Sequence, residues 1–219
     1  MKLAATIILL AGSVRAFCQI DPGSNWQLFV DSHLIQTLSQ AELRLQQPER
    51  KEIVLTTDKP WEGPSSAYFT ILKDRDVYRL YYRGFCPDDL ADQQVTCMAE
   101  SRDGVHFNRP NFGIYEFNGI RDNNIVYRGV ESHNLSPFLD RNPACPPDQR
   151  YKALGGVSSK LYAFVSADGI HWKKLQTAPV MTDGSFDSLN LAFWDPAINA
   201  YRCYNRYFSS AGGVRAIQH

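Results

Sequence analysis

Three kinds of segment recur in the same order along this sequence, and this repeat constrains the fold more than any other feature. The first has an acid seven residues before an aromatic side chain, the second is a Tyr-led alternating stretch, and the third is a turn containing Asp-Gly. Tandem units of this kind indicate a solenoid or a propeller. The acid-led segments are Glu62–Phe69, Glu131–Phe138 and Asp187–Trp194, the alternating ones begin at Tyr78, Tyr151 and Tyr201, and the turns are Ser101–Phe107 and Ser166–Trp172.

Read in order, one unit predicts an acid-led strand, a Tyr-led strand, a third strand, an Asp-Gly turn and a fourth strand, which is a four-stranded propeller blade. We expect an all-β fold with blade one at about 61–117, blade two at about 125–181 and an incomplete blade three from about 186. Rings of this type usually have about 4 to 8 blades, so a truncated propeller is expected. A β-sandwich built from the same hairpins is the alternative, and the ordered repeat favours the propeller.

The N-terminus predicts export. Lys2 precedes an apolar run that ends in Val14-Arg15-Ala16, which is typical of a signal peptide over residues 1–16 with cleavage after Ala16. Residues 17–60 then form a lead-in segment to the partial propeller at 61–219. We expect a periplasmic or extracellular protein that does not span a membrane and is a monomer when full length.

Charge and cysteine usage exclude several other classes. Lys plus Arg and Asp plus Glu are equal at 23 each, so nothing favours a nucleic-acid partner. Cys97 and Cys203 fit as small buried strand residues rather than as zinc ligands, because no Cys-x-x-Cys or paired His pattern is present. The sequence therefore indicates no metal or other cofactor, and it leaves a structural calcium ion open.

The acids that lead the repeats are the candidate catalytic residues. Inner strands of a propeller surround one axial funnel, so Glu62, Glu131 and Asp187 are expected to converge. Neighbouring carboxylates repel one another, and the resulting split in their pKa values suits acid–base cleavage of a glycosidic bond. The competing hypothesis is structural: the acids accept backbone N–H groups or pair with Arg83 and Arg206.

Residues beside these acids are expected to bind a sugar ring through flat faces and hydrogen-bonding edges. The predicted substrate-binding residues are Trp61, His133, Asn134 and Asn190. Phe69 and Phe138 recur at one blade position and are predicted to pack between blades, whereas His106 and His171 lie in outer turns and are not expected to be catalytic.

The sequence resembles the five-bladed propeller proteins of the arabinanase, levansucrase and invertase group, and most closely the exported bacterial members similar to glycoside hydrolase families 32 and 43. The matching motifs are Leu28-Phe29-Val30-Asp31, Pro60-Trp61-Glu62, the two Ser-x-Asp-Gly-x-His turns, Pro137-Phe138-Leu139-Asp140, Arg150-Tyr151-Lys152 and Ala192-Phe193-Trp194-Asp195.

This resemblance implies a hydrolase of plant or algal polysaccharides or oligosaccharides. It implies a general base on blade one, a modulating acid on blade two and a general acid on blade three, the blades of Glu62, Glu131 and Asp187. Family 43 typically has Asp, Asp and Glu in these roles, the reverse of the types found here. A non-catalytic carbohydrate-binding propeller and an inactive fragment of such an enzyme are the alternatives.

Overall fold

The computed structural model describes residues 23, 27–84, 94–209 and 213–219 of the chain. It divides into two compact units, Met1–Lys51 and Glu52–His219. In the first unit the described residues form neither strand nor helix, and nearly all of them are exposed. The predicted signal peptide at 1–16 lies outside the described residues, so it stays a prediction.

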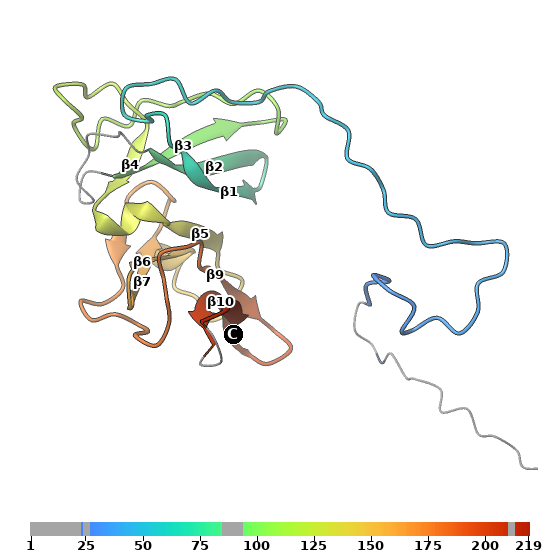
Figure 1. The fold of residues 1–219 in the computed structure, drawn as a ribbon. Helices are drawn as coiled ribbons and strands as arrows, with labels where there is room; N and C mark the ends of the chain where they lie inside the picture. Colours follow the sequence, from blue (N-terminus) through green and yellow to red (C-terminus); the bar gives the residue numbers. More distant parts are fainter. Residues whose placement is uncertain (1–22, 24–26, 85–93, 210–212) are drawn as a thin grey trace, which may run out of the picture. The chain divides into compact units, whose positions relative to one another are not determined.

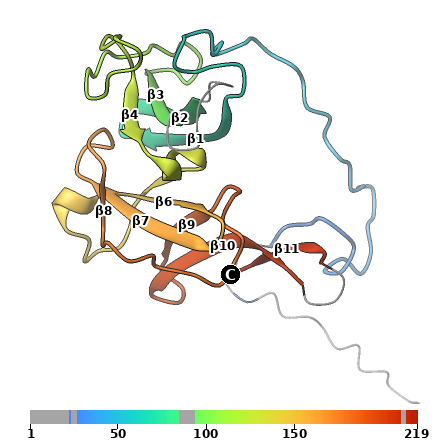
Figure 2. The ribbon, with the colours of Figure 1, turned by 60° about the vertical axis from the view of Figure 1, so that its left-hand side comes forward.

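The second unit consists of three antiparallel sheets, which can be followed in Figures 1 and 2. In each sheet every strand pairs with its neighbour along the chain, as in a propeller blade. The first sheet contains β1 (Ala67–Asp74), β2 (Val77–Gly84), β3 (Val95–Ser101) and β4 (Ile125–Arg128); the second contains β5 (Ser136–Leu139), β6 (Tyr151–Val157), β7 (Lys160–Ser166) and β8 (Lys173–Lys174); the third contains β9 (Leu191–Asp195), β10 (Ala200–Phe208) and β11 (Arg215–Gln218). Two short 3-10 helices, η2 (Val130–His133) and η3 (Pro147–Gln149), flank β5.

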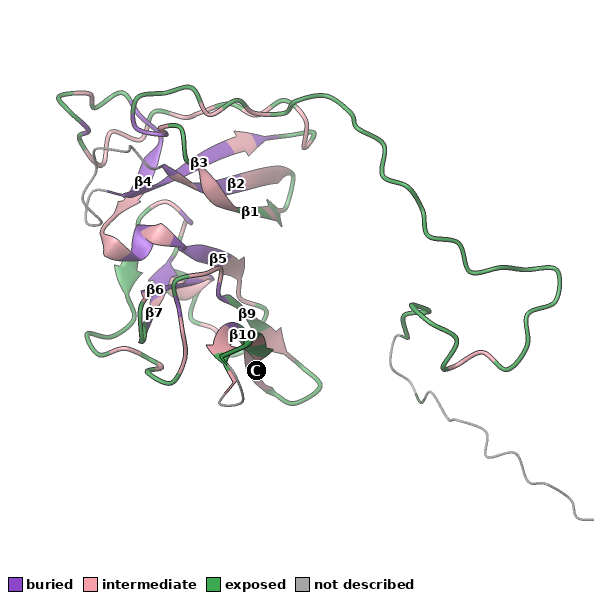
Figure 3. Cartoon of the chain, viewed as in Figure 1, coloured by how far each residue is buried: buried purple, intermediate pink, exposed green. Residues whose placement is uncertain are grey.

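The sheets pack face to face through alternating side chains. In β6, Ala153 points into the apolar cluster shared with the first sheet, whereas Leu154 points into the cluster shared with the third. This alternation is the period of two that a strand imposes, and it lets one strand serve two interfaces. Figure 3 shows the buried residues concentrated in the first two sheets. A further cluster, which includes Leu80 and Cys97, covers the other face of the first sheet.

The first strands of the three sheets lie next to one another, because β1 contacts β5 and β5 contacts β9. Each of these strands is also the edge strand of its own sheet. Sheets that meet along their first strands and stack through their faces are the arrangement of propeller blades. The predicted all-β partial propeller is therefore confirmed, and the β-sandwich alternative is not what the chain forms.

One strand lies elsewhere than the repeat suggested. The prediction started blade two at about Ile125, whereas the structure pairs Ile125–Arg128 with β3 as the fourth strand of the first sheet. Asn124 contributes to this pairing: its Nδ2 donates to the Met98 carbonyl at 3.0 Å, and its main-chain carbonyl accepts from the Met98 N–H at 3.0 Å. The segment after the first Asp-Gly turn instead makes only an isolated bridge, between Glu100 and Asn108.

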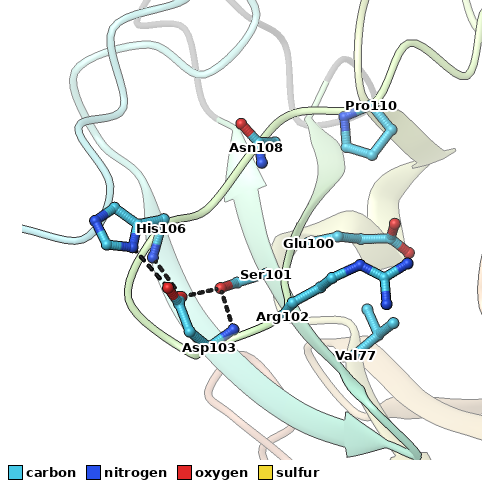
Figure 4. A pocket seen from close by; sticks show the side chains of 8 residues that line it. All are labelled: Val77, Glu100, Ser101, Arg102, Asp103, His106, Asn108 and Pro110. Carbon is cyan, nitrogen blue, oxygen red and sulfur yellow. Dashed lines mark hydrogen bonds and ion pairs between the residues drawn. The ribbon is translucent and has the colours of Figure 1, made fainter.

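The two Asp-Gly turns are equivalent, as predicted. Gly104 and Gly169 have φ angles of 81° and 76°, which glycine adopts without steric cost. In each turn the Asp carboxylate accepts two backbone N–H groups and pairs with the following His, so that His106 and His171 are bonded locally. Figure 4 shows the first turn beside a surface pocket of about 370 Å³.

The second turn also joins two sheets. Tyr81 Oη in β2 donates to the Gly169 carbonyl at 3.0 Å, and Arg79 donates to the Asp168 carbonyl. Beside it, Arg150 holds Asp74 through two hydrogen bonds of 2.6 and 3.0 Å. The contact between the first and second sheets therefore combines an apolar centre with a polar rim.

Candidate functional site

Glu62 is buried beside the apolar cluster of the first sheet that includes Leu80 and Cys97, and it does not face an open funnel. Arg109 donates to both carboxylate oxygens, with Nε 2.6 Å from Oε1 and Nη2 2.9 Å from Oε2. The Lys59 N–H donates to Oε2 at 3.0 Å, and the Tyr82 hydroxyl donates to Oε1. With the side chain fully out of solvent, this carboxylate has the arrangement of a structural ion pair.

Trp61 takes part in the same buried structure. Its ring is in the apolar cluster, and its Nε1–H donates to Asn124 Oδ1 at 2.7 Å. Asn124 in turn donates to Tyr82 Oη at 2.9 Å, so Trp61 and Glu62 are linked through Asn124 and Tyr82. Because the Trp61 ring is buried in this cluster, it is not placed to stack on a sugar from solvent.

Glu131 lies in η2 and is also held internally. Lys174 Nζ lies 2.6 Å from Oε1, and the Tyr127 hydroxyl donates to Oε2 at 2.9 Å. Burial by itself raises the pKa of Glu131, but the hydrogen bonds from Lys174 and Tyr127 outweigh it and the pKa is lowered. Glu131 is thus a buried, ionised carboxylate.

Asp187 is the exception among the three predicted acids, because 51% of its side chain is exposed. Its carboxylate pairs with Arg206 of β10. Its main-chain carbonyl accepts from the Tyr68 hydroxyl at 3.2 Å and from His133 Nε2 at 3.3 Å. Since Tyr68 lies at the start of β1 and His133 lies just before β5, Asp187 marks the place where the first strands of the three sheets begin.

We call Tyr68, His133, Asp187 and Arg206, together with Arg83 and Gln94, the inner-strand mouth. The rings of Tyr68 and His133 are 5.5 Å apart, and the Arg83 guanidinium lies 5.0 Å from the centre of the Tyr68 ring. His133 Nδ1 is 3.2 Å from Arg83 Nη1 and 3.0 Å from Gln94 Oε1. Burial and the Arg83 charge lower the pKa of His133, so its imidazole is neutral at pH 7.

A backbone irregularity orients Tyr68. This residue has a φ angle of 57°, which is costly for a side chain other than glycine, and the register of β1 shifts between Ala67 and Thr70. Such bulges re-aim a side chain out of the regular alternation of a strand and occur next to binding sites. Tyr68 lies within this bulge, and its hydroxyl donates a hydrogen bond to the Asp187 carbonyl.

Asn134 and Asn190 hold the loop that carries Asp187. Both side chains are fully buried, and both donate from Nδ2 to the Ser188 carbonyl at 2.8 Å. Asn134 Oδ1 also accepts from the Gly156 N–H at 2.8 Å. Of the four predicted substrate-binding residues, only His133 therefore lies at the mouth.

The structure thus does not bring the three predicted carboxylates into one solvent-filled pocket. Glu62 accepts a backbone N–H and Asp187 pairs with Arg206, as the structural hypothesis described. The partner of Glu62, however, is Arg109 rather than Arg83. The mouth contains Arg83, Gln94 and Tyr68, which the predicted site did not include. Arg83 and Arg206 occupy the same position of the Tyr-led repeat, and that equivalence is the sequence signal that points to them.

Metal-binding clusters and membrane-spanning helices are absent from the part of the chain that the structure describes. There, no group of three or more His, Cys, Asp and Glu side chains is arranged to hold a metal ion. Within the same residues, no helix is long and apolar enough to cross a membrane. Cys97 is fully buried in the first sheet, as predicted, and Cys203 is partly buried in the third.

No protein-family model matches the sequence, and no curated protein matches it significantly. Solved structures of several sugar-processing proteins resemble parts of it. One belongs to a report that the GH130 family of mannoside phosphorylases contains glycoside hydrolases that target β-1,2 mannosidic linkages in Candida mannan. Its sequence is 17% identical to this chain, and the match has a TM-score of 0.44 and covers 72% of this chain and 48% of the other.

The second is a fructofuranosidase from Schwanniomyces occidentalis, 16% identical with a TM-score of 0.43 over 77% of this chain and 38% of its own. The third is an N-acetylgalactosamine deacetylase from F. plautii, which is 19% identical. Its match has a TM-score of 0.41 and covers 64% of this chain and 40% of the deacetylase. This chain therefore spans less than half of the length of each. The assignment of the partial propeller rests on the sheet order and packing of the chain itself, and that fold is the one implied by the resemblance to arabinanases, levansucrases and invertases.

Proposed function

We propose that this chain is a carbohydrate-active propeller of the glycoside hydrolase type, which binds a glycan at the inner-strand mouth and uses Asp187 as a reacting carboxylate. The observation that carries the proposal is that Asp187 alone among the predicted acids presents its carboxylate to solvent, at the point where the first strands of the sheets meet. The axial end of a propeller is where ligands of this architecture bind.

The mouth offers the chemistry that a sugar requires. The Tyr68 ring supplies a flat face, and the half-exposed Asp187 carboxylate supplies oxygens that accept hydrogen bonds from sugar hydroxyl groups. Arg206 orients the Asp187 carboxylate through their ion pair. Together these groups support recognition of hydroxyl groups around a sugar ring, with the Asp187 carboxylate beside the Tyr68 ring and His133.

A second candidate function is carbohydrate binding without hydrolysis. Cleavage of a glycosidic bond ordinarily uses two carboxyl groups on either side of the scissile bond. Glu62 and Glu131 are committed to Arg109 and Lys174 in the interior, so neither is the second group in this structure. That observation is what supports binding without hydrolysis as the second candidate.

The test is hydrolysis and binding measured on one panel of arabinan, levan and inulin oligosaccharides. Asp187→Asn is expected to lower the rate of reducing-sugar release by about 100-fold or more, the scale of a lost acid–base group, while binding persists. The matched control is Asp195→Asn, which removes a carboxylate paired with Arg202 at the other end of β9. Full hydrolytic rate in Asp187→Asn would overturn the catalytic role, and binding without turnover by the unchanged protein would select the second candidate.

We also propose that the protein is exported, on the basis of the apolar N-terminal run ending at Ala16. N-terminal sequencing of protein secreted by a bacterial host is expected to begin at Phe17. A mature chain that still starts at Met1 would contradict this proposal without affecting the proposed site.

A further inference from the structure

A thiol and an amine are in contact on the second sheet, in a cluster separate from the inner-strand mouth. Lys152 Nζ in β6 lies 3.2 Å from Cys145 Sγ, which is in the loop between β5 and η3. The same Nζ lies 2.5 Å from Asp140 Oδ2 and 3.3 Å from the Gln149 carbonyl. The proposed function uses none of these side chains.

The cluster holds the two nucleophiles together in a residue pair of which Cys145 is partly exposed. Asp140 has no exposed side-chain surface and Lys152 has only 14%, so the position of the amine is fixed by its surroundings. Asp140 is itself fixed by the Tyr201 hydroxyl, which donates to Oδ2 at 2.6 Å. Cys145 is partly exposed, in contrast to Cys97, which is fully buried. The residue that carries the thiol therefore borders solvent, from which a small oxidant would arrive.

We propose that Cys145 and Lys152 form a redox-responsive modification site at which peroxide oxidation joins the two side chains through a sulfur–nitrogen bond. The Cys145 thiolate first attacks hydrogen peroxide, whose O–O bond breaks, giving a sulfenic acid and, with a proton, one water. The Lys152 nitrogen lone pair then attacks that sulfur. The S–O bond breaks, the amine loses one proton, and a second water leaves. Overall one thiol, one amine and one peroxide give one sulfenamide and two waters.

The charged groups around the pair predict how the reaction depends on pH. Burial and the neighbouring Asp140 raise the pKa of the Cys145 thiol. Burial lowers the pKa of Lys152, but its hydrogen bonds to Asp140 and Cys145 outweigh this and raise it. Tyr201 faces the same amine, and burial raises the pKa of its hydroxyl. Both reacting groups thus lose their protons only in alkaline solution, and cross-linking is faster at pH 9 than at pH 7.

The cross-link has a structural consequence at the contact between the second and third sheets. The bond removes the positive charge of Lys152, which leaves the buried Asp140 carboxylate with the Tyr201 hydroxyl of β10 as its remaining side-chain partner. A buried carboxylate that loses its cation is destabilised. Oxidation is therefore expected to loosen this contact.

The experiment treats the purified full chain with hydrogen peroxide at pH 7 and pH 9 and maps tryptic peptides by mass spectrometry. The expected product joins the peptides of Cys145 and Lys152, weighs two hydrogen atoms less than the reduced pair, and separates on treatment with dithiothreitol. Its rate of formation should rise about tenfold per pH unit. The reason is that the fraction of Lys152 in the unprotonated form rises about tenfold per pH unit below the pKa of the amine.

Two variants decide the assignment. Cys145→Ser should give no linked peptide, and Lys152→Arg, which keeps the charge without a primary amine, should stop at a sulfenic acid that dimedone traps. If Lys152→Arg fails to fold, the linked peptide of the unchanged protein and its loss in Cys145→Ser still decide the question. Oxidation of the unchanged protein to a dimedone adduct or a disulfide, with no sulfur–nitrogen-linked peptide at either pH, overturns the proposal.

Discussion

Replacing Glu62 with Gln should lower the free energy of unfolding of the protein, because Glu62 has a structural role. The carboxylate is fully buried and accepts two hydrogen bonds from Arg109, a backbone N–H and a Tyr82 hydroxyl. Removing one member of a buried ion pair leaves the other charge uncompensated, at a cost of about 3 to 5 kcal/mol. Because the amide keeps the shape of the carboxyl group and some of its hydrogen bonds, we expect the low end, about 3 kcal/mol.

For a domain of this size, a loss of about 3 kcal/mol lowers the melting temperature by about 6 to 12 °C. The assay is urea unfolding followed by tryptophan fluorescence, with Trp61 next to the substituted side chain as a local reporter. The control is Asp187→Asn, which breaks a half-exposed ion pair and should cost less than about 1 kcal/mol. A Glu62→Gln variant as stable as the unchanged protein would refute the structural role of Glu62.

Three further predictions test the packing of the sheets. The hydrogen bond from Arg150 lowers the pKa of Asp74 to about 2 from 3.8, so the stability it contributes is present above about pH 4 and lost as pH falls toward 2; acid unfolding of Asp74→Asn should be correspondingly less steep over that window. Gly169→Ala should lower the melting temperature more than Gly104→Ala, because both φ angles are positive but only at Gly169 would the added Cβ lie 2.5 Å from a neighbouring side chain, against 3.6 Å at Gly104. Asn134→Ala should cost about 1 to 3 kcal/mol in chemical denaturation, because it removes the buried side-chain acceptor of the Gly156 N–H.

The repeat predicted the sheets well because each blade is built from local pairings. Hairpins such as β1–β2 and β6–β7 join neighbouring segments, and the Asp-Gly turns mark where β3 and β7 end. The strand Ile125–Arg128 was placed in the wrong sheet by the repeat, because it reaches β3 after a long loop. The side chain of Asn124 joins it to β3 through the Met98 carbonyl, and a repeat does not reveal such a contact.

The candidate site was less predictable for a related reason. Residues at the same position of the repeat have the same structural environment where they lie in strands. The three acids lie before the strands, in segments that differ in structure from one sheet to the next. Glu131 is in a 3-10 helix and turns toward Lys174, whereas Glu62 turns toward Arg109, 47 residues along the chain. Partners so distant in sequence are set by the folded backbone and not by spacing.

The position of a bound glycan tests the central claim most directly. The measurement is a crystal structure of the Asp187→Asn variant soaked with the oligosaccharide that binds best in the panel of arabinan, levan and inulin fragments. The inner-strand mouth predicts sugar density within hydrogen-bonding distance of Tyr68, His133 and position 187. Sugar bound instead in the surface pocket beside Asp103 and His106, with the mouth empty, would contradict it.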